Sequence, residues 1–136
     1  MSDSMLTVEI VAPDHGVLKD EQVSSLVVPA VEGYMGILPH HAPLMAELRI
    51  GEIKVEHPDE SIRILATSGG FLMVENNLVT ILADTAELAQ DIDIQRAEEA
   101  KQRAEQRLTE RTEGLDATRA QAALVRAVNR LRVAGR

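Results

Sequence analysis

The sequence contains no cysteine, no tryptophan, and only one tyrosine and one phenylalanine among its 136 residues. The absence of cysteine excludes a disulfide framework and thiol chemistry. Two aromatic side chains, Tyr34 and Phe71, are too few for a base-stacking surface, and a net charge of −8 disfavours nucleic acid as a partner. No apolar run is long enough to span a bilayer, and the first eleven residues lack a basic side chain. We therefore expect neither a membrane helix nor a signal peptide, and a cytoplasmic location.

Proline and glycine are unevenly distributed, and their distribution divides the chain near Asp91. Residues 1–90 hold all five prolines and six of the eight glycines, with four Lys/Arg against fourteen Asp/Glu, a formal charge of −10. Residues 91–136 hold no proline and nine alanines, with ten Lys/Arg against eight Asp/Glu, a formal charge of +2. The first segment is typical of strands and turns, and the second of helices. We predict two domains with these boundaries.

Within residues 1–90, short runs alternate between apolar and polar residues with a period of two, which indicates β-strands. The run that begins at Leu26 is expected to end at Pro29, and Asn76-Asn77 is expected to form a tight turn. Strands at about ten-residue spacing predict an antiparallel β-sandwich or barrel rather than a βαβ fold. The alternating runs are 6–10, 44–48, 53–55, 62–66 (with Ile62, Ile64 and Ala66 on one face), 71–75 and 78–83.

This β-rich part carries no recognisable catalytic or metal-binding motif. His40 and His41 are adjacent, and adjacent side chains on an extended chain point to opposite faces, so they rarely share one ion. Ser68 lacks the surroundings of a nucleophile elbow, since Ala66 stands where that turn requires glycine. The sequence also lacks the glycine-rich pattern of a phosphate-binding loop. We expect no enzymatic activity and no metal requirement.

Residues 91–136 predict two helices joined by a short connection. Asp91 and Asp93 provide capping oxygens for the first helix, Gly114 ends it, and Asp116 or Thr118 begins the second. Facing stripes of small apolar residues predict that the two helices form an antiparallel hairpin. The stripes consist of Ala97, Ala100, Ala104 and Leu108 on the first helix, and of Ala120, Leu124, Ala127 and Leu131 on the second.

The hairpin is expected to be marginally stable and strongly basic on one side. Burying four to six methyl-sized groups contributes only about 3–5 kcal/mol before entropy is counted, so a ligand or partner could decide its state. Helical geometry puts Arg96 and Arg103 on one side of the first helix, where they could converge with Arg126 and Arg130 of the second. Four guanidinium groups would suit a polyphosphate. A solvated basic face that meets an acidic protein surface is the alternative.

Three runs of residues, in order along the chain, resemble signature motifs of the epsilon subunit of F-type ATP synthases. They are Gly33–Leu44 (GYMGILPHHAPL), Ala66–Val74 (ATSGGFLMV) with Val79–Ala83 following, and Arg126–Leu131 (RAVNRL). The resemblance implies a non-catalytic rotor subunit made of a β-sandwich and a two-helix arm. The sandwich would bind the gamma subunit and the c-ring, and the extended arm would reach the alpha/beta catalytic hexamer and restrain ATP hydrolysis.

The same resemblance implies a peripheral location on the cytoplasmic face of the bacterial inner membrane, with membrane association only through the complex. A free-standing nucleotide-sensing module that is not part of a rotary complex is the alternative function. Copurification with the gamma subunit would distinguish the two, because a free sensor should not bind it.

Ile92-Asp93-Ile94-Gln95-Arg96-Ala97 resembles the motif Ile/Leu-Asp-x-x-Arg-Ala through which some family members bind ATP. The resemblance implies that ATP is a regulatory ligand that favours the folded arm, with carboxylates near the base and ribose and arginines near the phosphates. It also implies rotor contacts at Tyr34 and His41, although many bacterial members carry glutamate at the first position. The implied ATP-binding residues are Glu87, Ile92, Asp93, Arg96, Ala97, Arg103, Arg126 and Arg130.

Overall fold

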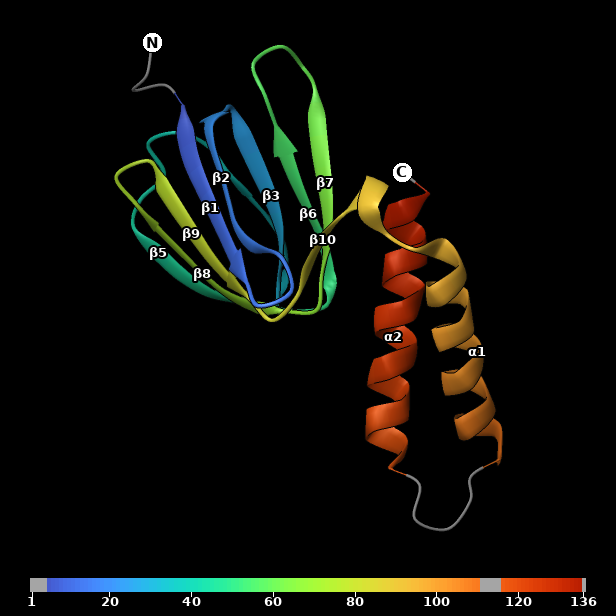
Figure 1. The fold of residues 1–136 in the computed structure, drawn as a ribbon. Helices are drawn as coiled ribbons and strands as arrows, with labels where there is room; N and C mark the ends of the chain where they lie inside the picture. Colours follow the sequence, from blue (N-terminus) through green and yellow to red (C-terminus); the bar gives the residue numbers. More distant parts are fainter. Residues whose placement is uncertain (1–4, 111–115, 136) are drawn as a thin grey trace.

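The computed structural model describes residues 5–110 and 116–135, in which a β-sandwich is followed by two antiparallel helices (Figure 1). The expected fold class is therefore confirmed; Gly114, the expected end of the first helix, lies outside the described residues. The strands are β1 (Leu6–Ala12), β2 (Gly16–Val23), β3 (Ser25–Ala30), β4 (Gly33–Ile37), β5 (Leu44–Leu48), β6 (Gly51–Glu56), β7 (Ile62–Thr67), β8 (Gly70–Glu75), β9 (Leu78–Ala83) and β10 (Ala86–Leu88). A 3₁₀ helix, η2 (Ala89–Asp91), leads into α1 (Ile94–Glu110) and α2 (Ala117–Ala134).

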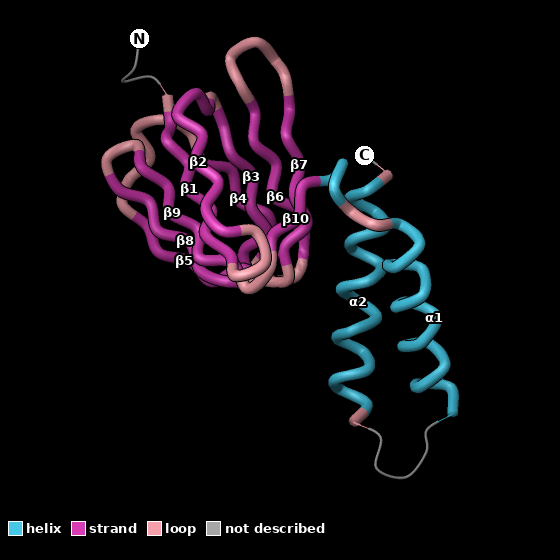
Figure 2. The backbone as a smooth tube through the Cα atoms, viewed as in Figure 1, coloured by secondary structure: helices cyan, strands magenta, loops and turns pink. Residues whose placement is uncertain are grey.

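The strands fall into two halves, β5-β8-β9-β1-β2 and β10-β7-β6-β3, and β4 pairs with β3. The halves are joined where β3 meets β5, at the pairing of Ala30 with Leu48. Every pairing is antiparallel except that of β1 with β9, which run parallel in register from Thr7 beside Leu78. Figure 2 shows how the strands wrap around a common interior and leave the two helices to one side.

The interior of the sandwich is made from the inward positions of these strands. In β1, for example, Leu6, Val8 and Ile10 are buried and alternate with half-buried residues, as the period of two predicts. Asn76 and Asn77 both adopt positive φ in the tight turn between β8 and β9, which confirms the expected turn.

Two details of the strands differ from the sequence predictions. Strand β3 does not end at Pro29 but continues to Ala30, and Pro29 lies opposite Tyr34 of β4. In β7, Ile64 and Ala66 share a face as expected, but that face is the outer one, where they belong to a second apolar cluster, and Leu65 joins the sandwich core. The sequence pattern of β7 is apolar on both faces because helix α2 covers its outer face.

The helices begin and pack largely as predicted. The side chain of Asp93 accepts a hydrogen bond from the backbone N–H of Arg96 at 3.0 Å, and Asp116 accepts one from Arg119 at 3.1 Å. Asp91 does not serve as a cap for α1, because it is the last residue of η2. The seam between the helices is narrow because four buried alanines line it: Ala97 and Ala104 on α1, and Ala120 and Ala127 on α2.

Candidate functional site

Helix α2 lies closer to the sandwich than α1 and carries the contacts that hold the hairpin there (Figure 1). Ala66 of β7, Ile92 after η2 and Val133 near the end of α2 form a small apolar cluster. The buried side-chain amide of Asn129 donates a hydrogen bond to the carbonyl of Gly51 at 2.9 Å. The hairpin therefore rests on few apolar groups, and specific polar contacts contribute much of its attachment.

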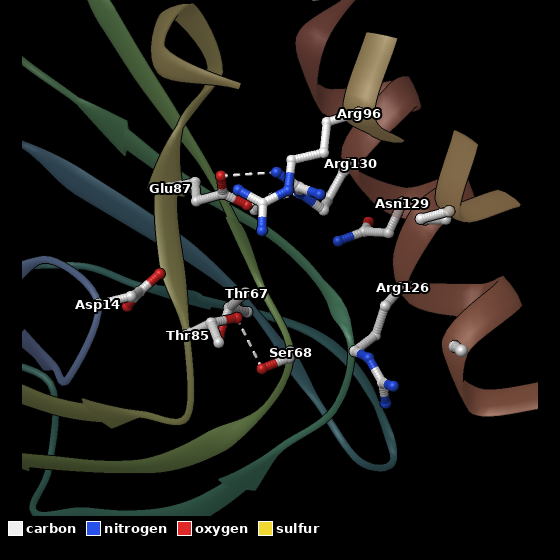
Figure 3. Close-up of a pocket in the computed structure, with 13 residues that line it drawn as sticks. Asp14, Thr67, Ser68, Thr85, Glu87, Arg96, Arg126, Asn129 and Arg130 are labelled. Atoms are coloured by element: carbon white, nitrogen blue, oxygen red, sulfur yellow. Dashed lines mark hydrogen bonds and ion pairs between the residues drawn. The ribbon is translucent and has the colours of Figure 1, made fainter. Parts of the chain in front are cut away.

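A cavity of about 450 Å³ lies between the sandwich and the hairpin. This volume is within the range of small-molecule sites. Figure 3 shows arginines from the two helices on one side of it, and hydroxyl and carboxylate groups from the strands on the other. Its lining comprises Asp14, Ala66, Thr67, Ser68, Thr85, Glu87, Arg96, Ala100, Ala123, Arg126, Ala127, Asn129 and Arg130.

An ion pair spans the cavity from the edge strand β10 to α2. Arg130 donates from Nε to Oε1 of Glu87 at 2.6 Å and from one terminal nitrogen to Oε2 at 2.9 Å (Figure 3). Both side chains are about three quarters buried, with 24% and 27% of their surfaces exposed. A bidentate pair of this kind is short and directional, and partial burial makes it stronger than an exposed surface pair.

Arg96 and Arg126 line the same cavity and differ from Arg130 in their partners. Within residues 5–110 and 116–135, neither guanidinium lies within ion-pair distance of a carboxylate. The cavity therefore presents two arginines that are available to an anion and one that is already bound to Glu87. Three guanidinium groups facing a space of this size can bind a polyphosphate by charge-assisted hydrogen bonds.

The sandwich side of the cavity is polar, and apart from Glu87 its polar residues were not predicted as site residues. Thr85 donates from its hydroxyl to the hydroxyl of Ser68 at 2.7 Å, and Asp14 accepts from the backbone N–H of Ala86 at 3.2 Å. Thr67 is buried and its hydroxyl donates to the carbonyl of Gly69. Asp14 and Thr85 lie in turns that are distant in sequence from Thr67 at the end of β7, so no spacing pattern could have indicated that they meet.

The remaining members of the predicted ATP-binding set have other places in the structure. Ile92 belongs to the apolar cluster beneath α2, Asp93 caps α1, and Ala97 is buried in the helix seam. Arg103 is exposed on α1 and is not among the residues that line the cavity. The motif at residues 92–97 thus starts and docks the first helix, and its Arg96 also lines the cavity.

The two residues expected at the rotor contact lie at the sandwich. Tyr34, on β4, is half exposed; its hydroxyl accepts from the N–H of Glu52, and the guanidinium of Arg49 lies 5.1 Å from its ring centre. His41 lies in the loop between β4 and β5, where its Nδ1 donates to the carbonyl of Ala42 at 2.7 Å. Tyr34 also lies beside α2, because it lines a cavity together with Val125 and Asn129.

In the part of the chain that the structure describes, no group of three or more histidine and carboxylate side chains is placed to hold a metal ion. Among the same residues, neither helix is long and apolar enough to cross a membrane.

Comparison with known proteins places this arrangement in a family. Residues 5–89 match the model of the β-sandwich domain of the ATP synthase delta/epsilon chain, and residues 90–135 match the model of its long α-helix domain. The chain belongs to the ATP synthase delta/epsilon family. It is 50% identical to the ATP synthase epsilon chain of Symbiobacterium thermophilum, with 99% of this chain and 95% of that one covered. It is 46% identical to the epsilon chain of Moorella thermoacetica, with 96% of each covered.

Chains of two solved ATP synthase structures agree with the architecture. A chain of the mitochondrial ATP synthase of Euglena gracilis is 23% identical, with a TM-score of 0.77 over 97% of this chain and 81% of that one. A chain from the central stalk and c-ring structure of Tetrahymena thermophila is 15% identical, with a TM-score of 0.59 over 98% and 99%. Membership in the family confirms the expected epsilon subunit, a stalk subunit rather than a catalytic one.

Proposed function

We propose that this epsilon-type chain couples rotation of the gamma subunit and c-ring to ATP synthesis, and that its arm restrains ATP hydrolysis. In this proposal residues 1–90 form the docking domain and residues 91–136 the arm, and ATP favours the folded arm. The chain is then a peripheral protein at the cytoplasmic face of a bacterial membrane, which it reaches only through the complex. Its curated relatives are named ATP synthase epsilon chains, which favours this function over a free-standing sensor.

An exposed apolar face of the sandwich supports docking to the rotor. We call it the outer apolar face; cross-strand pairing brings together Met45 with Met73, and Phe71 with Leu82, on its surface. Met45 is 75% exposed and Phe71 is 58% exposed, and contiguous apolar surface of this kind marks a protein interface. Glu47 lies opposite Phe71 at the margin. A partner with an apolar centre and a basic margin would fit it, and we propose that this partner is the gamma subunit.

The observation that carries the arm proposal is the way the hairpin is attached. Its contacts with the sandwich are the Asn129–Gly51 hydrogen bond, the Glu87–Arg130 ion pair and the small apolar cluster around Val133. These contacts are few enough to be exchanged for contacts with a partner. In addition, the described part of α2 contains four arginines and no acidic residue, so an acidic surface on the catalytic hexamer would attract it once extended.

The cavity between sandwich and hairpin supports ATP as the ligand of the folded arm. Arg96 comes from α1, Arg126 and Arg130 come from α2, and Glu87 comes from the sandwich. A polyphosphate that contacts the three arginines and the hydroxyls of Ser68 and Thr85 would join both helices to the sandwich and would oppose extension of the arm. ATP would act here as a clamp, since the described residues around the cavity include no nucleophile-and-base pair and no metal-binding group.

The arm proposal is tested by truncating the chain after Asp91 in the assembled enzyme. We expect the enzyme to remain coupled and to hydrolyse ATP faster, because the docking domain is kept and the inhibitory arm is lost. Unchanged hydrolysis would contradict an inhibitory role. Loss of coupling would instead show that the arm is needed for assembly.

The ligand proposal is tested by calorimetry with ATP and ADP on the full-length chain. We expect ATP-selective binding that is lost in Arg126→Ala, which removes a guanidinium that lines the cavity. Arg119→Ala is the matched control, because Arg119 lies on the same helix but not in the cavity lining. Equal loss in both variants would indicate a general charge effect, and absence of binding at millimolar ATP would contradict the ligand proposal.

A further inference from the structure

Arg130 and Glu87 form a bidentate pair at the cavity. The guanidinium of Arg130 donates two hydrogen bonds, from Nε and from one terminal nitrogen, and the carboxylate of Glu87 accepts both, at 2.6 and 2.9 Å. A phosphate group recognises arginine through the same planar pair of N–H donors. A phosphate can therefore bind this pair of N–H donors only if the carboxylate of Glu87 moves away from them.

Arg96 and Arg126 provide the contrast within the same cavity. In residues 5–110 and 116–135, no carboxylate lies within ion-pair distance of either guanidinium. The cavity also contains Asp14, which accepts from the backbone N–H of Ala86 and does not contact an arginine. Of the three arginines in the cavity lining, Arg130 is thus the one that an internal anion occupies.

We propose that Glu87 is an internal competitor for the polyphosphate ligand of this cavity. In the ligand-free folded arm its carboxylate holds Arg130, and on binding a phosphate group of the ligand displaces it from that guanidinium. This inference rests on the ATP proposal above and gives Glu87 a different role from the base or ribose contact that the resemblance implies. Both the carboxylate and the phosphate are negative, so they oppose each other in a partly desolvated space.

The proposal has two consequences for the arm. First, the Glu87–Arg130 pair joins β10 to α2 without a ligand, so binding exchanges one connection between sandwich and arm for another. The measured affinity for the ligand then reflects the difference in free energy between the ligand contacts and the Glu87–Arg130 pair that they replace, and not the full strength of the arginine–phosphate contacts. Second, a ligand with more negative charge competes better with the carboxylate, which favours a triphosphate over a diphosphate.

Inorganic tripolyphosphate separates this role from contact with a base or ribose, because it has neither. We would measure its binding and that of ATP by calorimetry on the full-length chain and on Glu87→Gln. Glutamine keeps the shape of the side chain but removes the competing charge. We expect Glu87→Gln to bind tripolyphosphate about tenfold more tightly than the parent chain, as removal of one partly desolvated like charge would give. Glu47→Gln, which removes the same charge from the exposed surface of β5, should bind as the parent does.

A second measurement follows Arg130 itself. Its Nε–H proton is hydrogen-bonded to Glu87 at 2.6 Å, so its NMR signal should move when tripolyphosphate is added to the parent chain. In Glu87→Gln the ligand-free signal should already differ, and the amide spectrum of the rest of the chain should stay the same. This spectrum distinguishes a displaced carboxylate from a hairpin that has lost its fold.

The outcomes separate this inference from the ATP proposal. If the parent binds ATP and Glu87→Gln binds tripolyphosphate no more tightly but ATP more weakly, Glu87 contacts the base or ribose and the competitor role is wrong. If the variant loses both ligands with its fold intact, Glu87 supports binding and the competitor role is again wrong. If neither protein binds either ligand, the ATP proposal fails as well.

Discussion

Asn129 of α2 donates its side-chain amide to the backbone carbonyl of Gly51, at the start of β6 and 78 residues earlier in the chain, with a distance of 2.9 Å. Asn129 is 7% exposed, so this bond is shielded from water. It fixes the rotation of α2 about its own axis relative to the sandwich, which the small apolar cluster around Val133 could not do alone. The orientation of α2 in turn places Arg126 and Arg130 at the cavity.

Asn129→Ala should loosen the hairpin without unfolding the sandwich. The substitution leaves the buried carbonyl of Gly51 without this donor, which costs about 1–3 kcal/mol. Because the chain has no cysteine, a pair introduced at Glu75 and Arg119 can carry labels on the two parts. We expect the distribution of label distances to broaden in Asn129→Ala. Gln106→Ala is the control, because that amide bonds Glu110 within α1; an equal effect of both variants would contradict a specific role for Asn129.

Gly51→Ala tests the packing of the sandwich surface that contacts α2. A Cβ atom at Gly51 would lie 2.5 Å from Cβ of Pro29 and 3.0 Å from the hydroxyl of Tyr34. Such overpacking typically costs about 1–3 kcal/mol of unfolding free energy. Gly36→Ala is a matched control, since a Cβ atom there meets nothing within 4 Å. Urea unfolding should show a lower midpoint for Gly51→Ala and little change for Gly36→Ala; similar midpoints would show that the backbone relaxes at no cost.

Asp20 and His57 give the sandwich a pH-dependent contact between β2 and the turn after β6. Burial raises the pKa of Asp20, but hydrogen bonds from His57 and from the N–H of Gln22, with the nearby charge of Arg63, outweigh it and hold the pKa below its usual value. A carboxyl with a lowered pKa in the folded state stabilises the fold above its unfolded pKa of about 4 and loses that contribution as the pH falls.

The unfolding free energy of the parent chain should therefore decrease between about pH 5 and pH 3, and part of this decrease should be missing in Asp20→Asn. The missing part should be on the order of 0.5 kcal/mol, because solvent screens the pair. Urea titrations at several pH values measure it. Asp84→Asn, at an exposed carboxyl, should keep the slope of the parent. Equal slopes for Asp20→Asn and the parent would mean that the contact contributes nothing.

Much of this fold could be predicted because its local patterns are unambiguous. Alternation in β1, the tight turn at Asn76-Asn77 and the cap at Asp116 each have a local physical cause, and all three are present in the structure. The sequence pattern of strand β7 was harder to interpret, because its outer face packs against α2 and is therefore apolar as well. The parallel pairing of β1 with β9 depends on contacts between distant segments, which no local pattern encodes.

Some features of the candidate site likewise follow from local sequence patterns, and others depend on contacts between distant segments. Arg126 and Arg130 recur one helical turn apart, so their shared side of α2 follows from the sequence. The pairing of Arg130 with Glu87 depends on how the hairpin packs against the sandwich. The resemblance, and not helical spacing, indicated that these residues share a site. Asp14 and Thr85 were not identified at all, because a turn near the N-terminus and the start of β10 become neighbours only in the folded sandwich.

Phe71→Arg tests whether the outer apolar face binds the gamma subunit. Phe71 is exposed on β8 between Glu47 and Leu82 of the neighbouring strands, so arginine would place a charge within the apolar surface. Loss of an aromatic anchor costs about 2 kcal/mol or more in an interface, and we expect affinity for isolated gamma to fall about thirtyfold. Ile62→Arg is the control, because Ile62 is similarly exposed but lies on β7, in the other half of the sandwich. Retained binding in Phe71→Arg, with the parent's thermal stability, would assign gamma to another surface, and loss of binding in both variants would mean that charge alone disrupts the complex.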